Sequence, residues 1–274
     1  MHRATRVPTT GGDGWIEAVV EGSGAPVVLL QTALLAEELR PLCEQPALAG
    51  FRRIRTHRRG YAGSSGCTGV RSVTAEVADC VALLDALGIA RAHVVGLSFS
   101  STIAMQLASD APDRVRTMTL LEAPPVHVPS SAAFRAINDE LAAHRAAHGA
   151  VAALDRLQTL LLGADWRAQV ERIVPGGVAQ MTGDAATFFD FDAPALMSWS
   201  FGRTGAGRFR GPVLYVGGSA SGRWFDEVRD LVLDWYPQAE AFVVEGADHN
   251  LAITSAAAIA PVLASFFDRN PVSG

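Results

Sequence analysis

Ser98 is the first residue whose type and setting could do chemistry, in the segment AHVVGLSFSSTIAM (residues 92–105). An apolar run there meets Gly96, then the serine, then a stretch typical of a helix. A serine at a sharp strand-to-helix turn holds its hydroxyl clear of the backbone, and the first N–H groups of the helix point into the same space. Such a serine suits nucleophilic attack on a carbonyl, but capping the helix is an equally common use.

A nucleophilic serine needs a base, and His249 is the histidine in the right place. The chain has seven histidines, and His249 follows the last strand-like run, in GADHNLA (residues 246–252). The others lie near the start of the chain, in strands, beside prolines or on an Ala-rich stretch. In a parallel sheet, Ser98 and His249 would share the carboxyl edge, where ligands bind. The alternative is a surface-loop histidine.

Composition narrows the classes of function. Of the 274 residues, 49% are hydrophobic and 19% charged, which allows a large buried core. The formal charge of −5 and the absence of an arginine stripe with aromatics argue against nucleic acid. The chain contains no lysine, which excludes a catalytic lysine. Its three cysteines are widely spaced, as expected of buried reduced thiols rather than a metal cluster or disulfide framework.

The chain has no stretch that predicts a membrane segment. Its N-terminus lacks an apolar signal region, and no apolar run approaches the ~18 residues of a membrane span. We therefore expect a cytoplasmic, soluble protein that acts on a small molecule, with a homodimer as an open option. We expect no metal and no organic cofactor.

Strand-like and helix-like segments alternate in the first half of the chain. Ser72 is placed to cap a helix that Gly88 ends. Strand–helix–strand units at this spacing predict right-handed crossovers and a mostly parallel sheet, hence the α/β class. The expected strands cover residues 15–22, 25–31, 51–57, 92–97 and 116–122, and the expected helices residues 72–87 and 99–111.

The pattern changes after Pro124-Pro125. Residues 126–211 are Ala-rich helical segments followed by a section rich in aromatics, without a convincing strand. Strands at 212–218 and 240–246 and helices at 224–236 and 256–267 then resume the first pattern. We expect a core of residues 1–125 and 212–274, with residues 126–211 as a helical cap that walls the site at the strand ends.

VVGLSFSS, the order of elements and GADH near the C-terminus resemble the α/β-hydrolase superfamily over nearly all of the chain outside the cap. The resemblance implies the α/β-hydrolase fold, with a mostly parallel central sheet flanked by helices. Some landmarks depart from the family. Ser100 replaces the second glycine of the serine turn, and HRRGYAGSS (residues 57–65) has a histidine and an alanine in the family's D-x-R-G-x-G-x-S loop.

The family's His-Gly pair, which follows the strand PVVLL, is Gln31-Thr32 here. The resemblance implies that the backbone N–H groups of Ala33 and Phe99 form an oxyanion hole. A backbone donor does not depend on the side chain, so the hole survives the substitution. Gln31 and Thr32 would then contact substrate, Gln31 through its amide.

The acid that orients the histidine has two candidate locations. At the family's usual position, after the penultimate strand, this chain has Ala220, and the nearest carboxylate is Asp226 in the next helix. The second location follows the strand after the nucleophile, where Glu122 stands. Adjacent strands lie ~4.8 Å apart, so Glu122 could reach His249. We favour Glu122 over Asp226 or no acid, a layout that resembles the zearalenone-type lactone hydrolases.

These residues predict a serine hydrolase that cleaves a carboxylic ester or lactone of a largely apolar small molecule. Trp199 would line the pocket under the cap, or simply pack the core of the cap. Two rival classes stay open. One is a non-hydrolytic enzyme on the same scaffold, such as a lyase, a C–C bond hydrolase, a cyclase or a cofactor-free oxygenase. The other is a non-catalytic ligand receptor, although that would need neither Ser98 nor His249.

Overall fold

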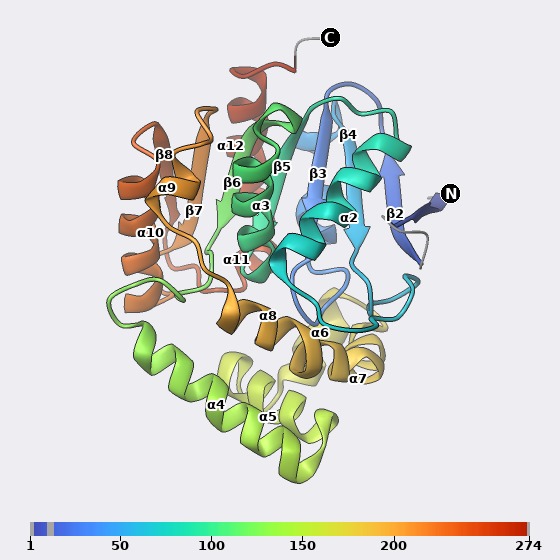
Figure 1. The fold of residues 1–274 in the computed structure, drawn as a ribbon, viewed down its shortest axis with the longest axis vertical. Coiled ribbons are helices and arrows are strands. Elements are labelled where there is room, and N and C mark those ends of the chain that lie inside the picture. Colours follow the sequence, from blue (N-terminus) through green and yellow to red (C-terminus); the bar gives the residue numbers. More distant parts are fainter. Residues whose placement is uncertain (1–2, 10–13, 273–274) are drawn as a thin grey trace.

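One eight-stranded sheet forms the centre of the molecule (Figure 1). The computed structural model describes residues 3–9 and 14–272, so His2 lies outside the described residues. The strand order is β1-β2-β4-β3-β5-β6-β7-β8. The strands are β1 (Arg3–Pro8), β2 (Trp15–Glu21), β3 (Pro26–Leu30), β4 (Arg52–His57), β5 (Ala92–Leu97), β6 (Val115–Leu121), β7 (Val213–Gly218) and β8 (Ala239–Val244).

All pairs from β4 to β8 are parallel, whereas β1–β2 and β2–β4 are antiparallel. This confirms the mostly parallel sheet and the α/β class. The edge strand β1 was not predicted, because its short sequence RATRVP has little apolar alternation. The register aligns the strand ends, with Leu30 opposite Gly96 and Leu121 opposite both Leu97 and Val216. The loops after β3, β5, β6 and β7 therefore leave the sheet side by side.

Helices cover both faces of the sheet (Figure 1). Ser72 caps its helix as predicted, with its hydroxyl accepting a hydrogen bond from the Ala75 N–H at 3.1 Å. One face is covered by α2 (Val73–Ala86), α3 (Phe99–Asp110) and α10 (Arg223–Trp235). The other face is covered by α1 (Arg40–Cys43), the 3₁₀ turn η1 (Pro46–Leu48), α11 (Leu251–Thr254) and α12 (Ala256–Asp268). A second 3₁₀ turn, η2 (Pro112–Arg114), precedes β6.

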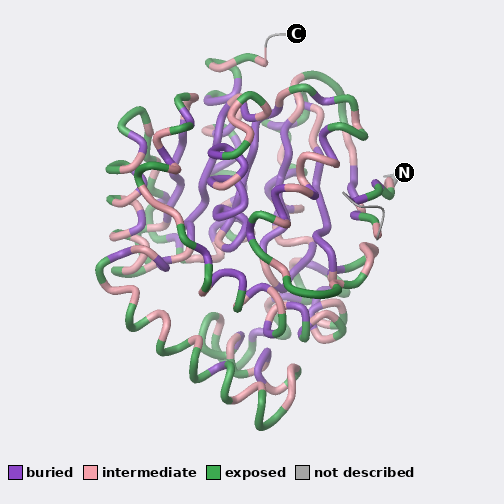
Figure 2. The backbone as a smooth tube through the Cα atoms, in the orientation of Figure 1, coloured by how far each residue is buried: buried purple, intermediate pink, exposed green. Residues whose placement is uncertain are grey.

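A group of helices between β6 and β7 lies beyond the end of the sheet (Figure 1). We call residues 131–198 the helical insertion. Its elements are α4 (Ser131–His148), α5 (Ala150–Leu162), α6 (Trp166–Ile173), α7 (Gly177–Thr187), the π-helical turn η3 (Phe188–Asp192) and α8 (Ala193–Ser198). Residues 126–211 contain no strand, as expected. Figure 2 shows exposed and half-buried residues along α4, in contrast to the buried residues of the central strands.

The helical insertion has an apolar core of its own around the fully buried Trp166. Leu34 and Leu35, from the loop after β3, belong to the same cluster. In contrast, the segment after the insertion, including α9 (Arg203–Ala206), packs on the core of the sheet through Ala206 and Phe209. In the described part of the chain, no helix combines the length and apolar character needed to cross a membrane.

Candidate active site

Ser98 occupies the sharp turn between β5 and α3. Its backbone has φ 48° and ψ −120°, which is unusual and costly for a non-glycine residue and typical of functional sites. The Ser98 N–H donates to the Leu121 carbonyl at 2.9 Å, which ties the turn to the neighbouring strand. The Ser98 side chain makes no capping hydrogen bond to α3, so the helix-cap interpretation is wrong.

Two small residues allow this turn. A Cβ at Gly96 would lie 2.6 Å from the Ser100 carbonyl oxygen, so only glycine permits the close approach of β5 and α3. Ser100, at the family's second glycine position, is fully buried. Its hydroxyl accepts from the Leu97 N–H at 2.9 Å and donates to the Leu30 carbonyl at 2.7 Å. Ser100 therefore links the serine turn to the end of β3.

Ser98, His249 and Glu122 form one chain of hydrogen bonds. His249 Nε2 lies 3.1 Å from Ser98 Oγ, and His249 Nδ1 lies 2.7 Å from Glu122 Oε2. Because a carboxylate only accepts, Nδ1 carries the proton and Nε2 is the acceptor for the Ser98 hydroxyl. The geometry thus leaves the imidazole in the tautomer that a general base requires.

Glu122 is held rigidly at the end of β6. Its side chain is fully buried, and its backbone also lies at positive φ, 44°. Its N–H donates to the Val216 carbonyl at 3.1 Å, and its Oε1 accepts from the Gly218 N–H at 2.7 Å. One carboxylate oxygen is thereby fixed by β7, and the other faces His249.

The competing acid, Asp226, lies on the surface. Its side chain is 61% exposed and pairs with Arg229 at 3.1 Å. The neighbouring residue on α10, Phe225, instead stacks on the His249 imidazole, with ring centroids 4.4 Å apart and planes 20° apart. Sequence reasoning missed Phe225, and its position within WFDEV, five residues after Ala220 at the family's usual acid site, was the available signal.

Two backbone N–H groups lack an acceptor within the described chain, one on the loop after β3 and one at the start of α3. Among residues 3–9 and 14–272, no group accepts a hydrogen bond from the N–H of Ala33 or of Phe99. Gln31 and Thr32 are both buried. The Gln31 Oε1 accepts from the Arg58 N–H at 2.6 Å, and its Nε2 has no partner among the described residues. Gln31 therefore retains an unused donor in a buried position.

Glu38 is a carboxyl group near the imidazole that sequence reasoning missed. Burial raises its pKa to about 7, although the positive charge available to His249 acts in the opposite direction. Its glutamate pair with Glu37, shortly after the loop that follows β3, was the only sequence signal.

Trp199 does not lie at the triad. Its Nε1 donates to the Gln106 side chain at 3.0 Å, and its ring stacks on Phe201 at 5.1 Å. Gln106 is two turns along α3 from Ser98, a rise of roughly 12 Å. The structure thus places Trp199 in the main apolar core, which agrees with the packing alternative, and its contact with substrate stays a prediction.

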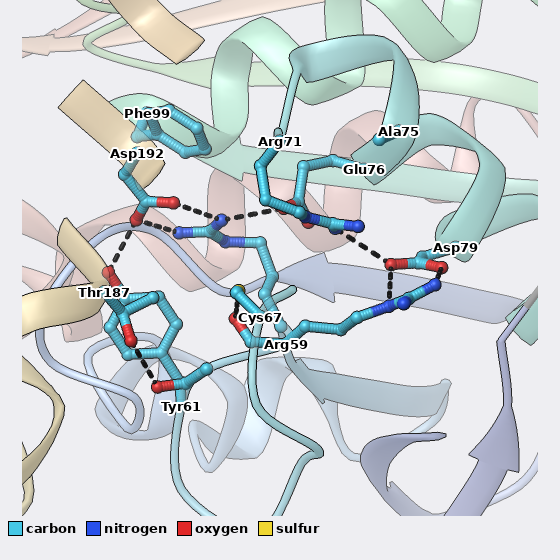
Figure 3. Close-up of polar contacts among 12 residues, drawn as sticks. Arg59, Tyr61, Cys67, Arg71, Ala75, Glu76, Asp79, Phe99, Thr187 and Asp192 are labelled. Atoms are coloured by element: carbon cyan, nitrogen blue, oxygen red, sulfur yellow. Dashed lines mark hydrogen bonds and ion pairs between the residues drawn. The ribbon is translucent and has the colours of Figure 1, made fainter. Parts of the chain in front are cut away.

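Buried charged side chains from the loop after β4, from α2 and from the helical insertion form a network (Figure 3). Arg58 donates to both carboxylate oxygens of Asp192 in the helical insertion, from Nη1 at 2.9 Å and from Nη2 at 2.6 Å. Arg59 donates to both carboxylate oxygens of Asp79 in α2, from Nε at 2.9 Å and from Nη2 at 2.8 Å. Sequence reasoning gave Arg58 no role, and its partner Asp192 lies 134 residues away along the chain.

The chain belongs to the alpha/beta hydrolase fold family, whose model matches residues 26–256. One relative is RutD of Azorhizobium caulinodans, which bears the name of a carbamate hydrolase. It is 36% identical over 114 residues, which are 40% of this chain and 42% of that protein. The rhodomycin D methylesterase DnrP of Streptomyces peucetius is 33% identical over 112 residues, 39% of this chain and 38% of that protein. The chain thus matches well under half the length of these curated relatives.

Similarity of structure extends over nearly the whole chain. A thermophilic esterase from Thermogutta terrifontis superposes with a TM-score of 0.79, covering 98% of this chain and 100% of that one, at 18% identity. At this level of identity the similarity establishes the fold, and the function must be argued from the site.

Proposed function

We propose that this protein is a serine hydrolase that cleaves a carboxylic ester or lactone of a largely apolar small molecule. The observation that carries the proposal is the hydrogen-bond chain from Ser98 through His249 to Glu122, with distances of 3.1 and 2.7 Å. The methylesterase name of one relative agrees with ester chemistry. A lactone is a cyclic ester, so the same chemistry applies to it.

In the proposed reaction, Ser98 Oγ attacks the carbonyl carbon while His249 Nε2 takes its proton. Glu122 holds the imidazole by Nδ1 and stabilises the imidazolium that forms. The N–H groups of Ala33 and Phe99 bind the oxyanion of the tetrahedral intermediate. His249 then gives its proton to the leaving alkoxide. A water deprotonated by His249 attacks the acyl-enzyme and restores Ser98.

The helices beyond the strand ends have a role in this proposal. Residues 126–211 act as a cap over a core formed by residues 1–125 and 212–274. A cap there excludes bulk water and strengthens the electrostatic interactions of the site. Gln31 Nε2, buried and without a partner in the described chain, is available to bind a substrate oxygen.

The test is labelling and turnover of the purified protein. We expect a fluorophosphonate probe to label Ser98 and an activated short-chain aryl ester to be hydrolysed. Ser98→Ala should abolish both, with turnover lower by on the order of 10⁴-fold or more. If Ser98→Ala retained turnover, the proposal would be wrong. Labelling of Ser98 without hydrolysis of any ester or lactone in a panel would instead indicate non-hydrolytic chemistry on the same scaffold.

A further inference from the structure

Arg58 binds the backbone of the loop after β3. Its guanidinium donates to the Gln31 carbonyl from Nε and to the Thr32 carbonyl from Nη2, both at 3.1 Å. The same cation lies 4.5 Å above the centre of the Phe99 ring. Arg58 therefore contacts the two segments that carry the proposed oxyanion donors, the loop after β3 and the start of α3.

The contact with the Thr32 carbonyl determines where the Ala33 N–H points. These two groups belong to one peptide unit, which is planar and trans, so its oxygen and its hydrogen point in opposite directions. A donor that fixes the oxygen on one side thus fixes the N–H on the other side. A positive charge at the oxygen also polarises the peptide and strengthens its N–H as a donor.

Tyr61 holds the next peptide unit. Its hydroxyl accepts from the Leu34 N–H at 3.4 Å and donates to Asp192 Oδ2. Leu34 has positive φ, 66°, a conformation that a leucine keeps only when its surroundings enforce it. Both peptide units that flank Ala33 are therefore fixed, one by Arg58 and one by Tyr61, and Figure 3 shows Tyr61 directed toward Asp192.

Asp192 secures both of these residues and comes from the helical insertion. The side chains of Arg58 and Asp192 are only 5% and 3% exposed. Burial disfavours the charged guanidinium, but the carboxylates of Asp192 and Glu76 outweigh it and raise the pKa of Arg58 above its ordinary value. Asp192, which the insertion supplies, thus fixes the position of the guanidinium at the Thr32 carbonyl through two hydrogen bonds.

The insertion also contacts the loop after β3 directly. Gln180 of α7 accepts from the Ala36 N–H at 2.9 Å and donates to the Leu34 carbonyl at 3.0 Å. Leu34 and Leu35 are buried within the apolar core of the insertion. The loop after β3 therefore contacts both the insertion and Arg58.

We propose that Arg58 and Tyr61, held by Asp192, are positioning residues that orient the Ala33 N–H for the oxyanion and so make the oxyanion hole depend on the docked insertion. This inference rests on the proposed hydrolase function. Arg58 and Tyr61 act through the loop, and neither touches the reacting atoms. Their effect is therefore expected on the transition state more than on the bound substrate.

The test compares Asp192→Asn with Asp79→Asn. Asp79 is a matched control, because its carboxylate is as buried and also binds an arginine through two hydrogen bonds. We expect Asp192→Asn to lower kcat on an aryl ester by about 10- to 100-fold with KM within about twofold, less than the loss of a whole donor. The inhibition constant for phenylboronic acid, which forms a tetrahedral adduct with serine, should rise in parallel. Asp79→Asn should lower the melting temperature and leave kcat within about twofold.

Two further variants make the outcome decisive. Tyr61→Phe removes a single hydroxyl without a charge and should lower kcat by about tenfold, which decides the matter if the aspartate variants do not fold. Arg58→Lys keeps the charge, but an ammonium cannot span two carbonyls and a carboxylate, so we expect little rescue. If Tyr61→Phe and folded Asp192→Asn keep wild-type kcat, or if Asp79→Asn loses as much, the inference is wrong. Loss of turnover in Ser98→Ala, measured alongside, separates that outcome from failure of the hydrolase proposal.

Discussion

Glu122 is the residue on which the assignment of the site turns. The family's usual acid position has no carboxylate here. The structure brings Glu122 Oε2 to 2.7 Å from His249 Nδ1, whereas the Asp226 side chain faces solvent. Its burial is compensated because each carboxylate oxygen has a hydrogen-bond partner. An acid one strand away from the usual position thus reaches the same imidazole nitrogen.

Glu122→Gln should lower kcat/KM on an aryl ester by on the order of 10³- to 10⁴-fold, because an amide can hold the imidazole in the wrong tautomer. Asp226→Asn is the matched control and should leave kcat/KM unchanged, because its side chain is exposed. Steady-state kinetics of both variants provide the measurement. Full activity in Glu122→Gln would remove Glu122 from the triad.

Glu38 predicts a pH dependence of stability. Its pKa is about 7 in the folded protein against an ordinary value of 4.5, so between these values the folded state binds a proton that the unfolded state has lost. The contribution of Glu38 to the free energy of unfolding is therefore most favourable below pH 4.5, where the side chain is protonated in both states. This contribution is lost as the pH rises through 7. Glu38→Gln should gain stability over the wild type between pH 5 and pH 8, by at most about 3 kcal/mol because the side chain is only partly buried. Chemical denaturation at the two pH values measures it; an equal difference at both would contradict the shift.

The turn between β5 and α3 shows how an element sets the geometry of a side chain. Gly96 lets the helix approach the strand, Ser100 ties the turn to the end of β3, and Ser98 takes the strained conformation in between. Strain at Ser98 and at Glu122 is maintained because adjacent strands bind the backbone at both positions. The sheet thus fixes the direction of the Ser98 and Glu122 side chains.

Gly96→Ala should destabilise the fold by about 2–4 kcal/mol, because its Cβ would meet backbone of α3 at 2.6 Å. Gly183→Ala, on α7, is the control: nothing lies within 4 Å of the added carbon, and alanine in a helix gains up to about 1 kcal/mol. Thermal denaturation distinguishes the two. Equal stability in both variants would mean that α3 can move away from β5 at no cost.

The loop after β3 connects the central sheet with the helical insertion through its contacts. The sheet supplies Ser98, Glu122 and His249 at its carboxyl edge, and the helical insertion packs against the loop after β3 through Leu34, Leu35 and Gln180. Stability of the insertion and the geometry of that loop are therefore coupled through shared apolar packing.

Trp166→Ala tests this coupling. The side chain is fully buried in the insertion and its Nε1 donates to Asp155 at 2.9 Å, so its loss should cost about 3–5 kcal/mol. We expect turnover to fall at temperatures where circular dichroism still reports folded protein, since the loop loses its packing before the sheet unfolds. Activity that persisted to the global transition would show that the loop is independent of the insertion.

Local chemistry in the sequence determined much of this protein. Apolar runs alternating with helical patterns specified the parallel sheet, and the position of Ser98, Glu122 and His249 just after strands placed them at one edge, because parallel strands end together. Tertiary structure alone decided which contacts are made. It paired His249 with Glu122, Trp199 with Gln106 and Arg58 with Asp192. Such contacts depend on side-chain packing between segments that are distant along the chain and leave no periodic signal in it.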